Sequence, residues 1–362
     1  MRMRRPSEGE RNHGETASVL TRMIRGMSLR KFSWATLLQG GPIIALLLLV
    51  VYFSVASPHF ASIDNLKNIG QQNAYLIILA VGQTMVIIGA GIDLSVGAVM
   101  AVSASIMAVL ATQEITLFGT TFGPVNVWLA VFTGFLVGTI AGIINGIVIA
   151  KGRIPDFVAT LGMMEAARGV ALLVTGGLPI PSHLTATELK GYLPEPIIWM
   201  GGKEVVGIPT GPLIAFIMVG IGWLILSQTV LGRSILAIGG NKEASRVSGL
   251  KVDRIKIATY TIMGMMGAVA GIVLTGRMNS ANALMATGVE LKCIAAVVIG
   301  GTNLFGGEGS IIGSLIGAII MGVLGNGLNL LNVSAFWQRV VMGLVIVAVV
   351  IFDQWRRRKF GI

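Results

Sequence analysis

The feature that most constrains this chain is its series of long runs without charge. Between Lys31 and Asp64 there is no Asp, Glu, Lys or Arg, and similar runs recur along the sequence. A helix needs about 20 mostly apolar residues to cross ~30 Å of hydrocarbon, because lipid offers no partner for backbone polar groups. Only 12% of the residues are charged, whereas soluble domains carry about 25%. The sequence therefore predicts an all-α, polytopic membrane protein.

About ten runs are predicted to span the membrane as one bundle with glycine-interrupted elements. They cover residues 37–57, 71–90, 94–111, 127–149, 157–176, 210–229, 257–276, 289–304, 309–331 and 336–352. We expect a basic N-terminal tail over residues 1–33, a transmembrane domain over 34–355 and a basic C-terminus over 356–362. The largest inner loop is predicted at 230–256.

The basic residues predict which way the chain is threaded. From a cytoplasmic start, 20 of the 27 Lys and Arg residues lie in segments on the inner side. Cytoplasmic loops collect Lys and Arg because such loops resist translocation and face an anionic leaflet. Both termini are therefore expected in the cytoplasm. The net charge of +11 then indicates contact with membrane lipid, and no nucleic-acid partner is predicted.

Two glycine-rich segments interrupt the apolar spans. The first reads GAGIDLSVG over residues 89–97, and the second reads IGGTNLFGGEG over 299–309. Glycine destabilises helices, and irregular backbone at membrane depth is tolerated only beside protein or a water-lined cavity. These segments are predicted to be pathway or hinge elements. Glycines at every fourth position in 127–149 and 309–331 instead favour close helix packing.

Uncharged polar side chains within the spans suit a path for a neutral, hydroxylated solute, because they exchange hydrogen bonds without selecting charge. The alternative is that they form hydrogen bonds between helices, which is the commoner role for any single residue. The pathway or hinge candidates are Gln83, Gly91, Asp93, Ser95, Gly97, Asn145, Gly300, Gly301, Thr302, Asn303 and Asn326.

Acidic residues within apolar spans each have a structural explanation to set beside a functional one. Asp156 follows Pro155 and is expected to cap the next helix. Glu165 and Arg168 are spaced to pair along one helix face. Asp93, flanked by glycines, either caps the following span or contacts substrate.

The chain has no visible catalytic or metal site, so it is predicted not to be an enzyme. It lacks the GxxxxGK[ST] loop that cradles nucleotide phosphates, and it has neither HExxH nor GxSxG. The single cysteine, Cys293, excludes an internal disulfide and a thiolate zinc site. We therefore expect no catalytic residue, no metal ligand and no cofactor in this chain.

The inner loop at 230–256 contains a predicted two-turn helix. Asn241 is placed to cap a helix over residues 242–247, and Gly249 is placed to end it in a left-handed turn. Such a helix suits docking into a groove on a partner, and the alternative is a charged helix held against lipid headgroups.

Several motifs, in order, resemble one family. They are GIDLSVG at 91–97, GGN at 239–241, IAAVVIGGTNLFGGEGSIIGSLIGA at 294–318 and NGLNLL at 326–331. The chain is identified as a member of the family of monosaccharide permeases, which are the membrane subunits of ribose-type ATP-binding-cassette importers. This family is allied to the branched-chain amino-acid permeases. The resemblance covers about residues 40–352. One departure is Lys292, where the family tends to carry an acid.

The resemblance implies function and partners. It implies an inner-membrane permease, present as a homodimer or paired with another permease, that receives a sugar from a periplasmic binding protein. It also implies a separate tandem-cassette ATPase that binds ATP and magnesium and docks on the GGN loop. The implied coupling residues are Gly239, Gly240, Asn241, Glu243, Ala244, Arg246, Ser248 and Gly249. The competing hypothesis is a gradient-driven carrier or facilitator without an ATPase.

Overall fold

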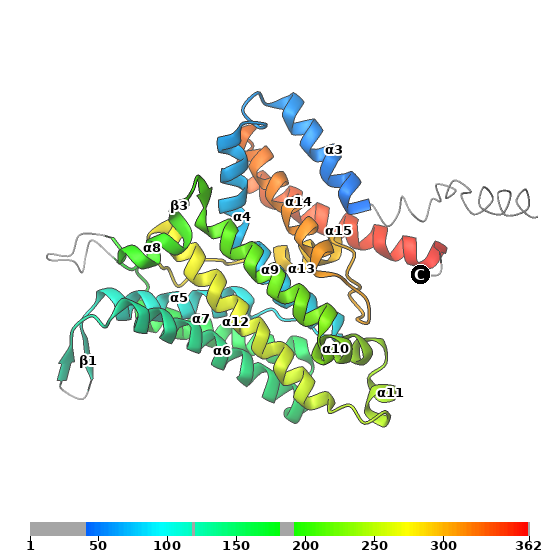
Figure 1. The fold of residues 1–362 in the computed structure, drawn as a ribbon, viewed down its shortest axis with the longest axis horizontal. Coiled ribbons are helices and arrows are strands. Elements are labelled where there is room, and N and C mark those ends of the chain that lie inside the picture. The colour runs from blue at the N-terminus through cyan, green and yellow to red at the C-terminus, as the bar shows by residue number, and fades with distance from the viewer. Residues whose placement is uncertain (1–40, 118–119, 182–191, 361–362) are drawn as a thin grey trace, which may run out of the picture.

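The computed structural model describes residues 41–117, 120–181 and 192–360, and these residues are predominantly helical (Figure 1). The predicted tail at 1–33 lies outside the described residues. The predicted basic C-terminus overlaps the last helix, α15, which spans Ala335–Phe360. The all-α polytopic prediction is confirmed, since apolar helices account for most of the described chain.

Among the described residues, six helices are long and apolar enough to cross a bilayer. They are α4 (Ile63–Ile88), α6 (Val127–Gly152), α7 (Asp156–Thr175), α9 (Thr210–Gln228), α12 (Val252–Met278) and α14 (Ile311–Leu330). Shorter apolar helices are α3 (Gly41–Ala56), α5 (Val96–Thr112), α10 (Val230–Gly240) and the apolar part of α15. The count of ten spans therefore stays a prediction.

Side-chain caps begin several of these helices. Ser62, Asn126 and Ser310 each accept a hydrogen bond from a backbone amide in the first turn of α4, α6 and α14, at 3.2, 2.9 and 3.4 Å. These amides have no partner within their helix, so a polar oxygen at the cap stabilises the helix start. The structure thus begins α4 at Ile63, eight residues before the predicted span.

The predicted span at 289–304 is wrong. Its helix, α13, covers only Val289–Ile299 and ends where Gly300 and Gly301 follow. Gly301 has a φ of 91°, a conformation that a helix cannot continue. Eleven residues rise only about 16 Å, roughly half the hydrocarbon thickness. The apolar run located this segment but did not reveal that its helix stops at Ile299.

Small elements lie at the two ends of the long helices. The hairpins β1 (Ile115–Leu117) with β2 (Thr120–Phe122) and β3 (Glu204–Val205) with β4 (Ile208–Pro209) are antiparallel, and α8 (Glu195–Gly202) precedes the second. They lie toward one end, and α10 with α11 (Lys242–Val247) lies toward the other (Figure 1). The second hairpin lies in the predicted outer loop, and α11 lies in the predicted inner loop.

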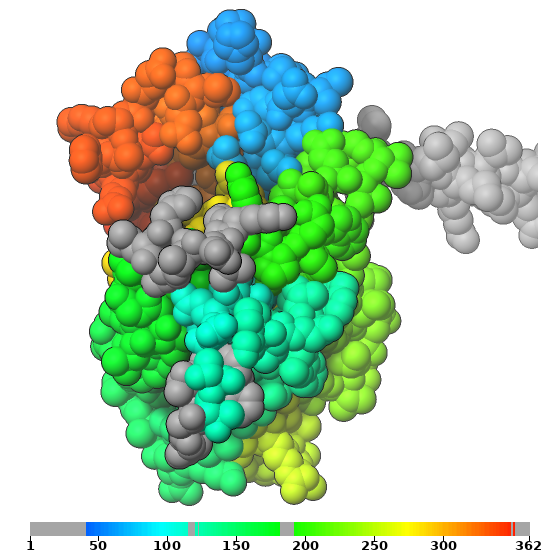
Figure 2. Space-filling model, turned by 90° about the vertical axis from the view of Figure 1, so that its left-hand side faces the viewer, coloured from blue at the N-terminus to red at the C-terminus, as the bar shows by residue number. Residues whose placement is uncertain are grey.

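The core is centred on α4 and α12. The apolar window of α4 is 83% buried inside the protein, whereas that of α7 is only 17% buried. Helix α4 therefore has protein on most sides, and α7 lies at the surface of the chain with most of its apolar window exposed. Viewed from the hairpin end, the surface of α3, α4 and α14 lies above that of α5 and α6 (Figure 2).

The predicted glycine stripe on α6 packs against α12 and α5. Gly142 lies directly against the Tyr260 carbonyl and Gly264 of α12, and Gly146 lies against Ile257. On α14, Gly313 and Gly317 similarly contact the backbone of α13 and Gly300. These contacts confirm the packing interpretation, because a side chain at such positions would separate the two backbones.

Candidate functional site

The first glycine segment is a true interruption between α4 and α5. Residues 89–95 carry no helix, and Ala90 has a φ of 55°, which residues with a side chain adopt infrequently. Asp93 lies here, only 2% exposed. Its Oδ1 accepts hydrogen bonds from the Ser95 amide at 2.7 Å and from the Ser95 hydroxyl at 2.6 Å. Asp93 therefore closes the turn that leads into α5.

The same turn is tied to two other helices. Asn145 of α6 donates to the Ser95 hydroxyl at 2.9 Å, and the Leu94 amide donates to the Thr160 hydroxyl of α7 at 3.2 Å. Gly97, in the first turn of α5, lies against the Ala286 carbonyl, so that a Cβ would be 2.6 Å from that oxygen. The first break is thus held by side chains and close packing on several sides.

The second break, between α13 and α14, contacts the first through its backbone. The Gly307 amide donates to the Ile88 carbonyl at 2.9 Å. A Cβ on Gly306 would lie 2.8 to 3.0 Å from atoms of Ala90. Gly306 and Gly307 both have positive φ, of 90° and 80°. The two glycine segments are 200 residues apart in sequence, but in the fold they meet.

The last turn of α10 lies against both breaks. Gly239 contacts the Ile88 carbonyl directly, and a Cβ on it would be 2.5 Å from the Gly307 nitrogen. Gly240, in the same turn, lies close to Gly307, since a Cβ on Gly307 would be 3.0 Å from the Cα of Gly240. We call the contact among residues 88–90, 239–240 and 306–307 the glycine junction. It joins the predicted coupling loop to both helix breaks mainly through backbone atoms.

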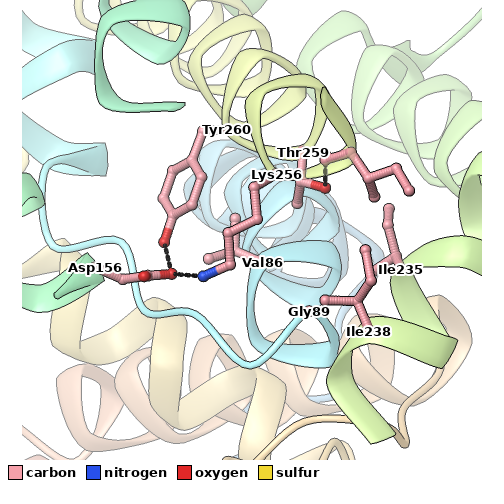
Figure 3. A pocket seen from close by; sticks show the side chains of 9 residues that line it. Val86, Gly89, Asp156, Ile235, Ile238, Lys256, Thr259 and Tyr260 are labelled. Atoms are coloured by element: carbon pink, nitrogen blue, oxygen red, sulfur yellow. Dashed lines mark hydrogen bonds and ion pairs between the residues drawn. The ribbon is translucent and has the colours of Figure 1, made fainter. Parts of the chain in front are cut away.

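A partly buried ion pair lies next to the first break. Asp156, the first residue of α7, accepts hydrogen bonds from Lys256 at 2.6 Å and from Tyr260 at 2.7 Å (Figure 3). Both donors are on α12, four residues apart and therefore on one face. A Cβ on Gly91 would lie 2.5 Å from the Asp156 carboxylate. The expected capping role of Asp156 is wrong, because its carboxylate bonds these side chains instead.

The predicted pair of Glu165 with Arg168 is also wrong. Among the described residues, Arg168 forms no ion pair with Glu165. Its guanidinium instead donates to the carbonyls of Ala283 and Met285 at 2.6 and 3.0 Å. Arg168 thus ties α7 to the segment between α12 and α13. Every residue has a backbone carbonyl, so a carbonyl partner cannot be identified from the sequence, and this explains the error.

Three of the remaining pathway candidates form hydrogen bonds within the protein. Asn326 exchanges hydrogen bonds with Asn65 at 2.9 and 3.0 Å, and Thr302 lies 3.4 Å from the Ser314 hydroxyl. Asn303 bonds within its own loop, where its Oδ1 accepts from the Phe305 amide. Asn326 and Thr302 thus contact other helices, as in the alternative interpretation, whereas Asn303 stabilises only its own loop.

Gln83 differs from the other candidates. It is fully buried on α4, and neither its amide oxygen nor its nitrogen has a hydrogen-bond partner in the described part of the chain. A buried, unpaired amide costs free energy, about 1–3 kcal/mol. Among the pathway candidates, Gln83 is therefore the one whose amide group is still free to form hydrogen bonds within the described part of the chain.

The predicted short helix in the inner loop is confirmed as α11. The Asn241 side chain accepts from the Ala244 amide at 2.9 Å, and Gly249 has a φ of 86°. Glu243 and Arg246 form an exposed ion pair at 3.7 Å, and the Ser248 amide closes the last turn onto the Ala244 carbonyl. Of its six residues only Ser245 is buried, and Val247 is 88% exposed.

Sequence reasoning missed part of this site. Gly306 and Gly307 lie within the second glycine-rich segment, but the sequence analysis names Gly300 and Gly301 as the hinge candidates there. Gly300 packs on α14 and not on the first break. Lys256 and Tyr260 were not selected at all. The signal available for them was a lysine and a tyrosine with helical spacing at the start of an apolar span.

Comparison with known proteins now identifies the family. The family model described as the branched-chain amino acid transport system permease component matches residues 65–350. The chain belongs to this permease family. The match spans both helix breaks, α10 and α11, so the glycine junction lies entirely within the family domain. No solved structure matches the chain.

Individual relatives are sugar permeases. The ribose import permease protein RbsC of Escherichia coli K12 is 42% identical over 325 residues, which cover 90% of this chain and 96% of the relative. RbsC of Bacillus subtilis is 40% identical over 314 residues, covering 87% and 92%. The L-arabinose transport system permease protein AraH of Escherichia coli is 33% identical over 320 residues, covering 88% and 92%. The predicted resemblance is confirmed.

Proposed function

We infer that this chain is the membrane permease subunit of an ATP-binding-cassette importer. It passes a monosaccharide, ribose or a related sugar, from a periplasmic binding protein into the cytoplasm. The similarity to the ribose import permeases supports the sugar class. The chain itself serves as a transport component, and ATP and magnesium bind to the separate ATPase.

The glycine junction is the observation that supports coupling within this function. The ATPase docks on α11, whose exposed Val247 offers an apolar contact and whose Asn241 cap keeps the helix formed. A displacement of α11 moves α10, since only Asn241 separates the two helices. Because α10 ends against Ile88 and Gly307, both helix breaks then move together. Close backbone contact transmits the displacement without side chains that can yield.

The remaining parts of the assembly follow the predicted orientation. Both termini and α11 lie on the cytoplasmic side of the inner membrane, and the hairpin β3–β4 lies on the side that faces the binding protein. A second permease copy completes the transporter, and lipid covers the exposed face of α7. Gln83 supplies a hydrogen bond to the sugar or its hydration water in a state in which α4 is accessible.

One reconstitution tests this function. We would measure ATP hydrolysis by the tandem-cassette ATPase of the importer, in nanodiscs with and without the chain, while adding binding protein loaded with ribose. Stimulation that requires both the chain and the loaded binding protein is the expected result. Ribose flux through the chain alone, with no effect on the ATPase, would instead indicate a gradient-driven carrier or facilitator.

The coupling role of α11 makes a separate prediction. The Val247→Asp and Arg246→Glu variants are each expected to lower stimulated hydrolysis at least about threefold, because a charged or reversed group faces the partner's groove. Both side chains are exposed, so the melting temperature of the permease should change little. Arg254→Glu, an exposed charge reversal on α12, is the matched control. Equal stimulation in all three variants would remove α11 from the docking surface.

A further inference from the structure

A polar cavity of about 380 Å³ opens beside α11, at the predicted cytoplasmic end of the bundle. Its walls come from the turn between α6 and α7, from α11 and from the first turn of α12. The lining includes four cationic side chains and two carboxylates, which are Arg153, Lys242, Arg246, Lys256, Asp156 and Asp253. The cavity therefore carries an excess of positive charge.

Two of the cations have no partner to neutralise them. Lys256 is paired with Asp156, and Arg246 is paired with Glu243 outside the lining. Within the described ranges, neither Arg153 nor Lys242 forms an ion pair. Arg153 ends α6 in a left-handed conformation with a φ of 54°. The lining carboxylate Asp253 forms no ion pair in these ranges either, so two unpaired cations against one carboxylate leave the cavity with a net positive charge. Two cationic groups at one cavity attract an anion with several acceptor oxygens, such as a phosphate.

The position of the cavity indicates where that phosphate comes from. Residues of the last turn of α6 and the first turns of α7 and α12 line it, so it lies at the level where membrane helices end. From Ile154 in its lining, an apolar surface continues onto α7 through Phe157 and Val158, each 53% exposed. Most of the rest of α7 is likewise exposed at the surface of the chain, since only 17% of its apolar window is buried.

We propose that this cavity binds the phosphate of an anionic phospholipid in the cytoplasmic leaflet. The headgroup lies between Arg153 and Lys242, and an acyl chain follows the exposed apolar face of α7. An acidic side chain of the ATPase would satisfy the charge but would make no use of an apolar surface inside the membrane. The proposal rests on the charges that line the cavity and on the predicted orientation, and it does not depend on which solute the chain transports.

The test compares two double variants that remove the same charge. Arg153→Gln with Lys242→Gln empties the cavity of its unpaired cations. Lys251→Gln with Arg254→Gln removes one lysine and one arginine from exposed positions of the neighbouring segment. Each protein is released from nanodiscs of phosphatidylcholine with a minor fraction of phosphatidylglycerol, and native mass spectrometry counts the retained phosphatidylglycerol. Melting temperatures are taken in the same nanodiscs and in pure phosphatidylcholine with millimolar inorganic phosphate.

Wild type and the exposed double variant are expected to retain phosphatidylglycerol and to melt higher in its presence. The cavity variant should retain roughly tenfold less, since each basic residue near an anionic surface favours binding severalfold. Equal retention by the two variants would overturn the proposal. Full stabilisation by inorganic phosphate alone would assign the cavity to a soluble anion. Unchanged lipid retention with lost ATPase association in pure phosphatidylcholine would assign it to the protein partner.

Discussion

The Gly239→Ala variant is expected to lower ribose uptake by the reconstituted importer at least roughly tenfold. The added methyl group would overlap the Ile88 carbonyl and approach the Gly307 amide. Both are backbone atoms, so α10 has to move away from both helix breaks. Overpacking of this kind costs about 1–3 kcal/mol even where side chains can adjust, and here they cannot.

The neighbouring glycine supplies the matched control. A Cβ on Gly240 has no atom within 4 Å, although the residue lies in the same turn of the same helix. Alanine favours a helix over glycine by about 1 kcal/mol at either position, so Gly240→Ala should keep full uptake. Uptake and ATP hydrolysis are measured together on both variants. If Gly239→Ala transported as well as Gly240→Ala, the junction would have no role in coupling.

Asp156→Ala is expected to destabilise the protein by about 3 kcal/mol, because it leaves Lys256 charged, nearly buried and unpaired. Tyr260 loses its hydroxyl acceptor in the same variant, and Gly91 loses the group it packs against. Unfolding is followed by the melting temperature in nanodiscs, with uptake measured in parallel. The double variant Asp156→Ala with Lys256→Ala should recover part of the loss, because no unpaired charge remains.

An exposed ion pair on the same protein calibrates that result. Lys67 and Glu204 are 3.2 Å apart, with side chains 32% and 45% exposed, compared with 12% and 17% for Lys256 and Asp156. Glu204→Ala should cost less than about 1 kcal/mol, as for other solvated pairs. Similar losses for Asp156→Ala and Glu204→Ala would mean that burial does not strengthen the role of Asp156.

The membrane helices could be predicted from the sequence because their signal is local. Twenty apolar residues define a span wherever they fold, and Asn241 with Gly249 defined both ends of α11 within nine positions. The length of α13 could not be predicted in the same way. Its continuation, Gly300 to Thr302, is uncharged like a span, and the helix ends there because Gly301 adopts a positive φ.

The candidate site was predictable in its parts but not in its assembly. Both helix breaks and the GGN loop were recognised, since glycine clusters are visible in sequence. Their meeting at Ile88, Gly239 and Gly307 depends on backbone contacts between distant segments, which leave no periodic pattern. Asp156 was assigned to a cap because its nearest sequence context fits one. Its true partner, Lys256, is one hundred residues away.

The glycine face of α6 also has a consequence for how the protein is made. Gly134 packs on α5, which is synthesised earlier, but Gly142 and Gly146 pack on α12. About a hundred residues separate the end of α6 from the start of α12, which a ribosome translates in roughly 5–20 s. During that interval the C-terminal half of α6 lacks the helix on which it packs. Its glycine face is therefore expected to stay uncovered until α12 has been synthesised.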